Sequence, residues 1–362
     1  MIPHIYLRVI RVNNYSLKII FTLSATVVFI AGFFAAPSAA VKGVSDGLTL
    51  CATAVIPSLF PFIFLSDFLI RSGLCRIAGK YLGPAVNFIF RLPGEAGCAV
   101  IMSFIGGYPV GAKMIAQLIE EGSITAGQGR RMLAFCVNAG PAFVIGTVGT
   151  VMLSSPRAGM ILYAALVISA LITGAFLRFF DSEESEISVR SEGRLNTDAV
   201  SQSVFNATNS MLMLCAWILL FSCINALVRC LPLSGKALLW LNIITEVTGG
   251  CARSVRAFPL CVTALVLGWS GLSVHCQLLP FIRQTGMSYL RFCLSRLIHG
   301  GVAACIAELL FKLFPCEVSV FSTASEVIPS AVSVSVPAAV AMLVLSAFII
   351  TESRIPHLQR LK

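Results

Sequence analysis

Residues 106–113 read GGYPVGAK and interrupt an otherwise apolar stretch that runs from 95 to 121. Glycine weakens a helix and proline removes a backbone hydrogen-bond donor, so this motif predicts that the helix breaks here. Inside a bilayer, broken backbone is stable only where protein groups or a water-filled cavity satisfy its polar atoms. The stretch therefore predicts a re-entrant hairpin whose tip reaches a polar centre within the membrane.

The composition of the whole chain indicates a membrane protein. Among its 362 residues, 57% are hydrophobic and 12% are charged, and the mean hydropathy is +0.90. Soluble domains carry about 25% charged residues, so much of this surface must face lipid. The net charge of +10 comes from basic residues at the ends of apolar runs, such as Arg8, Arg11 and Lys18, a pattern typical of attraction to lipid headgroups. We expect an all-α polytopic membrane protein that contacts the lipid bilayer and has no nucleic-acid partner.

Uninterrupted apolar runs predict transmembrane helices at 18–36, 157–178, 206–229, 288–313 and 331–350. Other apolar stretches contain further breaks, at 57–61, 138–141, 246–250 and 270–275. We predict a second re-entrant hairpin over 257–284, which gives an odd number of crossings, although basic residues place both chain ends in the cytoplasm. A further crossing at 237–252, or a hairpin that spans the membrane, would remove this disagreement, and the sequence does not choose between them.

The positions of the breaks predict two repeated halves, each with a broken helix or re-entrant hairpin. Their alignment pairs Gly107 with Gly271 and places 138–140 near 299–301. Repeats with interrupted helices at corresponding places are typical of transporters whose binding site lies near the bilayer midplane. The predicted organisation is an N-terminal transmembrane helix (1–40), a first membrane repeat with a hairpin (41–178), a hydrophilic linker (179–205), a second membrane repeat with a hairpin (206–315), and a C-terminal transmembrane helix with a basic tail (316–362).

The first hairpin tip offers features that suit a small anion. We predict that substrate is bound there by Gly107, Tyr108, Pro109, Gly111 and Lys113. The start of the returning helix presents backbone N–H groups and a positive helix end, and glycine lets a ligand approach the backbone closely. Lys113 adds a full positive charge; the alternative is that its side chain extends to the membrane surface.

Polar residues in the other breaks are further candidates. Ser273, His275 and Gln277 can donate hydrogen bonds to substrate oxygens, although a single membrane histidine can equally be a packed core residue. Asn138 can offer its amide to substrate or to a neighbouring helix. A carboxylate embedded in the membrane is costly unless it is protonated, paired or bound to a cation, so Glu246 predicts coupling to H⁺ or Na⁺. The structural alternative is an ion pair with Arg253 or Arg256.

Signatures of enzymes and of metal sites are absent from the sequence. It contains no GxSxG, Walker A or HExxH motif, and its 13 cysteines show no zinc-ligand spacing. We therefore expect no catalytic residues, no bound metal and no cofactor other than a coupling ion.

Several of these breaks resemble the YlbJ/SpoVV family of sporulation integral membrane proteins. The resemblance covers roughly residues 40–350, and its most specific part is the GYPxGAK core within 106–113; the other matching stretches are 47–62, 138–141, 246–250 and 271–277. The family belongs to the nucleoside recognition or Gate group, which is related to concentrative nucleoside transporters with two helical hairpins. The resemblance implies a transporter in the outer forespore membrane of an endospore-forming bacterium, with dipicolinate as its substrate.

These inferences favour a secondary transporter of a small organic anion. The first alternative is a transporter of nucleosides or related solutes. The hairpins of nucleoside transporters need carboxylates and amides to bind ribose and base, whereas this tip carries a cation. The second is a non-transporting sporulation membrane scaffold, which would need neither two sets of broken helices nor an embedded Glu246. The sequence leaves assembly into a homo-oligomer open.

Overall fold

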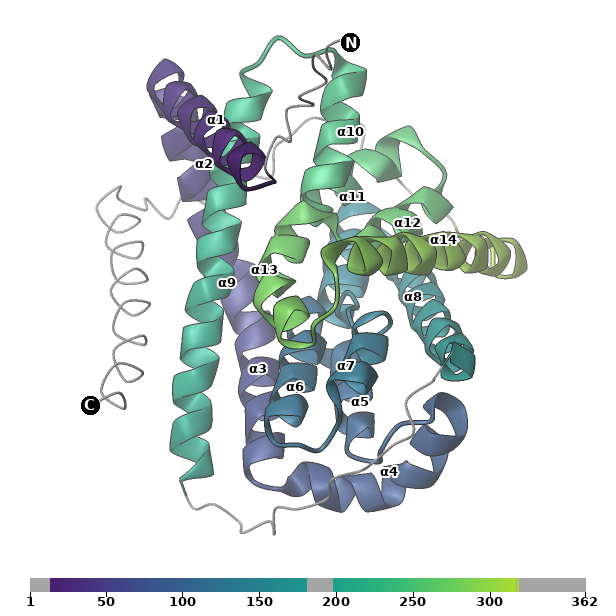
Figure 1. Cartoon of the computed structure of the whole chain (residues 1–362). Helices are drawn as coiled ribbons and strands as arrows, with labels where there is room; N and C mark the ends of the chain where they lie inside the picture. The colour runs from purple at the N-terminus through teal and green to yellow at the C-terminus, as the bar shows by residue number, and fades with distance from the viewer. Residues whose placement is uncertain (1–13, 181–197, 317, 319–362) are drawn as a thin grey trace, which may run out of the picture.

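The computed structural model describes residues 14–180, 198–316 and 318, and this part of the chain forms helices and no strand (Figure 1). Within it, five stretches are long and apolar enough to cross a membrane: Pro37–Arg71, Pro156–Phe180, Ala199–Arg229, Leu260–Gln284 and Tyr289–Leu313. The prediction of an all-α polytopic membrane protein is confirmed. The predicted C-terminal transmembrane helix, most of the hydrophilic linker, and Arg8 and Arg11 lie outside the described residues.

The first of the five stretches contains the predicted break at 57–61 but does not fold back there. It consists of α2 (Pro37–Leu50), a π-helical segment η1 (Cys51–Val55) and α3 (Ile56–Arg71). The wider π-helical turns directly precede Pro57, and local π-helical adjustment is one way in which a helix accommodates the bonds that proline removes. This long helix follows α1 (Asn14–Ala35) and packs along α9 (Ala199–Arg229).

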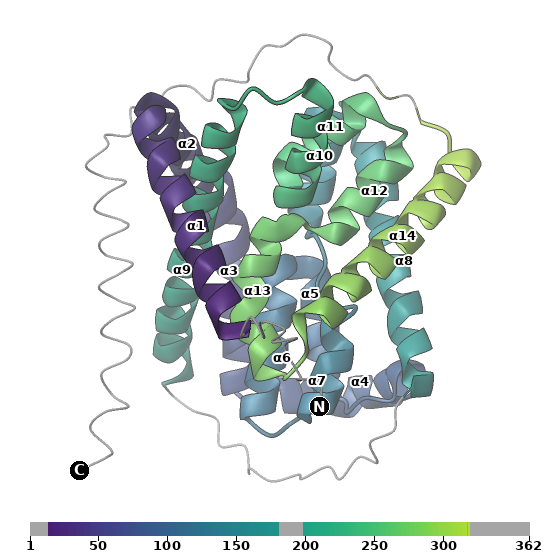
Figure 2. The same cartoon turned by 45° about the horizontal axis from the view of Figure 1, so that its top comes forward.

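The predicted hairpin over 95–121 is present. Helices α5 (Ala96–Gly106) and α6 (Tyr108–Glu120) pack against each other and are joined by Gly107 alone. A second hairpin is formed by α10 (Gly235–Thr245) and α11 (Val247–Ala257), joined by Glu246 in an extended conformation. The two hairpins lie toward opposite ends of the molecule in both views (Figures 1 and 2). Helix α4 (Leu74–Phe90) lies across one end of the molecule, the end at which α5 begins and α6 ends (Figure 1).

The prediction that placed the second hairpin at 257–284 was wrong. These residues form α12 (Leu260–Trp269) and α13 (Gly271–Gln284), which together make a 25-residue interrupted span instead of folding back. The interruption is real, because Ser270 and Gly271 both have φ of +75°. Glycine marks where a helix stops, but the angle at which the chain continues depends on tertiary packing.

The same order of elements occurs twice along the chain. In the first half, the hairpin is followed by an interrupted helix, made of α7 (Ala126–Leu133) and the π-helical η2 (Ala142–Met152), and then by α8 (Pro156–Leu177), which ends in the short η3 (Arg178–Phe180). In the second half, the hairpin α10–α11 is followed by α12–α13 and then by α14 (Tyr289–Leu313). This order pairs the tip at Gly107 with Glu246 and not with Gly271. The domain boundaries given above remain predictions.

Candidate functional site

Each hairpin tip lies against the interruption of the helix that follows it. Gly107 is so close to Gly140 that a Cβ on Gly107 would lie 3.3 Å from the Gly140 nitrogen. In the second half, a Cβ on Gly271 would lie 2.9 Å from the nitrogen of Val247, next to Glu246. Four places where regular helix stops are therefore brought together in two pairs.

The start of α6 packs closely against the interrupted helix. Pro109 lies in the first turn of α6, where its missing N–H removes no helical hydrogen bond. A Cβ on Gly111 would lie 2.1 Å from the carbonyl oxygen of Cys136. This close packing requires glycine at position 111. Contact of Gly111 with substrate remains a prediction.

Hydrogen bonds across the two halves satisfy backbone groups that the interruptions leave free. The Tyr108 hydroxyl donates to the carbonyl of Leu267, near the end of α12, at 2.8 Å. Conversely, the guanidinium of Arg296 on α14 donates to the carbonyls of Ala134 and Val137, just beyond α7. Arg296 is fully buried. Carbonyls at helix ends have no partner within the helix, so each half supplies hydrogen bonds that stabilise the broken helix of the other.

Asn138 lies in the non-helical segment between α7 and η2. Its side-chain amide donates to the Phe135 carbonyl at 2.8 Å and to the Ser103 hydroxyl at 3.3 Å. The amide oxygen is buried and has no hydrogen-bond partner among the described residues. An unsatisfied buried acceptor at a helix break is able to take up a ligand donor or a cation.

The second-half candidates divide into two groups. His275 is fully buried, with Nε2 2.9 Å from the Trp269 carbonyl oxygen and Nδ1 3.3 Å from the Tyr289 hydroxyl. Both ring nitrogens therefore have hydrogen-bond partners. This fits the alternative that His275 is a packed core residue. Ser273 is buried and Gln277 half-buried on the same helix, and their contacts with substrate remain predictions.

Glu246 forms the N-cap of α11. Its carboxylate accepts hydrogen bonds from the backbone N–H groups of Thr248, at 2.8 Å, and of Gly249. A carboxylate at a helix N-terminus is favoured by the helix dipole and by the free N–H groups there. No ion pair joins Glu246 to Arg253 or Arg256 in the described part of the chain. The positive end of α11 is thus occupied by the protein itself, and the role of Glu246 in ion coupling remains a prediction.

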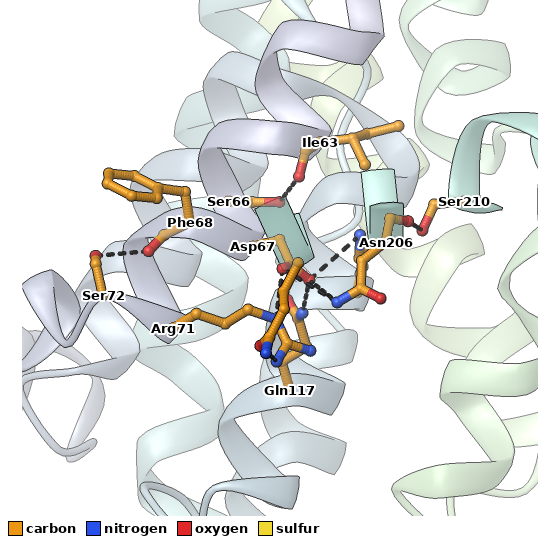
Figure 3. A network of polar contacts seen from close by, with 11 residues as sticks. Ile63, Ser66, Asp67, Phe68, Arg71, Ser72, Gln117, Asn206 and Ser210 are labelled. Carbon is orange, nitrogen blue, oxygen red and sulfur yellow. Dashed lines mark hydrogen bonds and ion pairs between the residues drawn. The ribbon is translucent and has the colours of Figure 1, made fainter. Parts of the chain in front are cut away.

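Lys113 is directed at a carboxylate that the sequence did not single out. Its side chain is buried, and its Nζ lies 3.7 Å from Oδ1 of Asp67 on α3. Figure 3 shows the polar groups gathered around Asp67. Lys113 is therefore paired with a buried carboxylate and does not lie free at the hairpin tip.

Two charged residues of this region were missed by the sequence reasoning, Asp67 and Arg296. The available signal was the same for both, since each is a charged residue inside an apolar stretch. Asp67 has a partner four positions away, Arg71, but its partner on the hairpin, Lys113, is 46 positions away. The carbonyls that Arg296 binds, those of Ala134 and Val137, are 159 or more positions away. Sequence spacing alone does not reveal such pairs.

A curated protein shares most of the chain. The sequence is 27% identical over 325 aligned residues to the sporulation integral membrane protein YlbJ of Bacillus subtilis (strain 168), covering 76% of this chain and 78% of the relative. The match supports the resemblance to the YlbJ family that the sequence motifs indicate. This agrees with the resemblance of the GYPxGAK core, and together with the apolar helices it establishes an integral membrane protein. No protein-family model matches the chain, and no solved structure matches it.

Proposed function

We propose that this protein is a secondary transporter of a small organic anion, with dipicolinate as substrate, in the outer forespore membrane of an endospore-forming bacterium. One observation carries the proposal. Two hairpins directed from opposite ends of the molecule each lie with their tip against a helix interruption, at Gly107 with Gly140 and at Glu246 with Gly271. Interrupted helices that meet in this way are typical of a transport site near the bilayer midplane.

The chemistry around the tips suits an anion. Buried Arg296 has no carboxylate partner among the described residues, and buried Lys113 lies on α6, the helix that starts at the first tip. The Asn138 amide oxygen and the hydroxyl of Ser273 add polar groups for orientation. Tyr108 and Trp269 supply aromatic faces for stacking on a pyridine ring.

Transport in this scheme requires the hairpins to move relative to the long helices. Movement of the first hairpin opens the site to one side, and movement of the second opens it to the other. Glu246 is the coupling residue in this proposal, because taking up H⁺ or Na⁺ would weaken its hold on the N–H groups of α11. Removal of that cap would free the tip of the second hairpin.

The alternatives are weaker on physical grounds. The first tip carries no carboxylate with which to bind ribose hydroxyls, which disfavours a nucleoside. A scaffold protein would gain nothing from glycines that bring two broken helices together inside the membrane.

Spores that lack this protein provide the test in the cell. We expect their dipicolinate content to fall well below that of the parent strain, and dipicolinate added outside the developing sporangium should not restore it. Normal dipicolinate content would contradict the proposal.

A further inference from the structure

Five polar residues on three helices form a cluster, and the transport scheme has so far used only one of them, Lys113. The Asp67 cluster includes Asp67 and Arg71 on α3, Gln117 on α6 and Asn206 on α9, which are labelled in Figure 3. Its fifth member is Lys113 on α6. The Asp67 side chain is fully buried at its centre. It accepts hydrogen bonds from Arg71 Nε at 2.7 Å, from Asn206 Nδ2 at 3.3 Å and from Gln117 Nε2.

The cluster has one carboxylate for two cations, and these cations are held unequally. Arg71 makes a charge-assisted hydrogen bond with Asp67, and its side chain is 35% exposed, so it is partly hydrated. Lys113 lies 3.7 Å from Asp67, and its Nζ is buried with no hydrogen-bond partner among the described residues. Burying an ammonium group costs free energy because it loses its hydrating water, and without hydrogen bonds in the protein most of this cost is not offset. Lys113 is therefore the member that gains most from a better anionic partner.

The position of Lys113 connects the cluster with the hairpin tip. It lies five residues after Tyr108, which is roughly 7.5 Å along a helix that rises about 1.5 Å per residue. Side chains in a helix lean toward its N-terminus, and here that direction is toward the tip. The flexible four-carbon stem of lysine allows the ammonium to exchange partners without movement of the backbone.

The two residues of the ion pair lie on parts of the protein that have different roles in the proposed transport cycle. Asp67 lies on the long helix that packs along α9, whereas Lys113 lies on the hairpin that we propose to move. Gln117, one turn after Lys113, also binds Asp67, so the same face of α6 is attached at two successive turns. The cluster holds the first hairpin against α3 and α9 in the conformation described.

We propose that Asp67 and Lys113 form a releasable ion pair, and that a substrate carboxylate replaces Asp67 as the partner of Lys113 when the hairpin moves. This inference rests on the proposed function. Asp67 competes with the substrate for one cation, so the empty transporter keeps its hairpin attached and the loaded transporter releases it.

The surroundings of the cluster fit a site near one membrane surface. A surface cavity of about 380 Å³, lined by Arg71, Ser201, Gln202, Phe205 and Asn206, adjoins it at the ends of α3 and α9. Glu121, directly after α6, is exposed, and partial desolvation raises the pKa of its carboxyl group above its usual value although nearby Arg76 and Arg71 oppose the shift. Once Lys113 leaves, Asp67 keeps its hydrogen bond from Arg71, which lines the cavity.

Competition between Asp67 and the substrate for Lys113 predicts that removing the charge of Asp67 strengthens substrate binding. In the purified protein, Asp67→Asn removes the competing charge but keeps a polar side chain of the same shape, so we expect dipicolinate to bind roughly fivefold or more tightly. The gain should vanish in the double variant Asp67→Asn/Lys113→Met. A purely structural role for Asp67 would instead weaken binding. Because Asp67→Asn leaves an excess of buried positive charge, Asp67→Asn/Arg71→Met serves as a charge-balanced second variant, and unchanged or weaker binding in both would overturn the proposal.

A second measurement needs no substrate and separates this proposal from the proposed function. Amide hydrogen exchange of residues 96–120 should be faster in Lys113→Met than in wild type, while the matched variant Lys80→Met, at an exposed lysine on α4, should leave it unchanged. If wild type does not bind dipicolinate, the proposed substrate is wrong, and this exchange experiment decides on the ion pair. Unchanged exchange in Lys113→Met would overturn the ion pair whatever the substrate.

Discussion

The hydroxyl of Tyr108, at the tip of the first hairpin, donates a 2.8 Å hydrogen bond to the carbonyl of Leu267, near the end of a helix in the other half. The Tyr108 ring is buried, so this bond forms away from water. It links a part that must move in the proposed transport cycle to the interrupted helix of the opposite half. The tip is thus attached at the point where the two halves meet.

Replacing Tyr108 by phenylalanine should affect stability and transport together. Loss of the hydroxyl leaves the Leu267 carbonyl with only the longer bond from the Ser270 hydroxyl, at 3.3 Å, and losing one hydrogen bond costs about 1 kcal/mol. We expect a lower melting temperature in detergent and slower transport. Tyr163→Phe is the matched control, because the Tyr163 hydroxyl donates to the Phe104 carbonyl at 2.9 Å within the first half. Equal losses of transport in the two variants would argue against a special role for the link at Tyr108.

Gly107→Ala should impair the protein more than an alanine at another glycine with positive φ. Gly107 has φ of +85° and ψ of −174°, a region that is essentially restricted to glycine and costs other residues about 1–3 kcal/mol. Its Cβ would also approach Gly140. Gly122→Ala is the control, since Gly122 has φ of +70° but open space around it. Thermal unfolding should give a lower melting temperature for Gly107→Ala than for Gly122→Ala. Similar melting temperatures would show that the contact with Gly140 is unimportant.

Arg296 should tolerate neither loss of its charge nor a change of its shape. In Arg296→Met the Ala134 and Val137 carbonyls lose their donor, which we expect to destabilise the protein by about 2–5 kcal/mol. Arg296→Lys keeps the charge but cannot present the planar fork that reaches two carbonyls, so an intermediate loss is expected. Arg291→Met, at an exposed arginine of the same helix, should change the melting temperature little. A stable, active Arg296→Met protein would contradict the proposed cross-half cap.

Glu246→Gln should separate the capping role from the coupling role. The glutamine oxygen can accept one of the two hydrogen bonds, but the amide NH2 group takes the place of the oxygen that accepts the other, so we expect a loss of stability smaller than that of Glu246→Ala. The charge is lost, so transport should no longer respond to an H⁺ or Na⁺ gradient. Glu246→Ala removes the cap as well and should cost about 1 kcal/mol of stability. Unaltered ion dependence in Glu246→Gln would remove this residue from the coupling step.

The sequence predicted the features that depend on local chemistry. Apolar runs located most of the long helices, and GGYPVGAK located the first hairpin, because two glycines and a proline stop a helix wherever they occur. The second hairpin was misplaced because its tip is Glu246, whose extended backbone needs no glycine, whereas the glycine at 271 belongs to a span that continues. Break positions follow from residue types, and the direction of the chain after a break does not.

The candidate site was predicted only in part, for a similar reason. Asn138 and the tip residues were expected at a polar centre; the structure places Gly107 against Gly140, and substrate binding there remains a prediction. The partner of Lys113, the cap formed by Glu246 and the bonds of Arg296 were not foreseen. Each depends on which helices pack side by side, information that spacing along one chain does not contain.

The central claim is the proposal that this protein, which is similar to YlbJ of Bacillus subtilis, moves dipicolinate across a membrane. Uptake of radiolabelled dipicolinate into proteoliposomes that contain only the purified protein tests it most directly, with uridine as the comparison solute and Gly107→Ala protein as the inactive control. We predict uptake that saturates with dipicolinate, exceeds that of the control, and is not inhibited by excess uridine. Uptake no greater than in liposomes with Gly107→Ala, or transport of uridine in place of dipicolinate, would contradict the account.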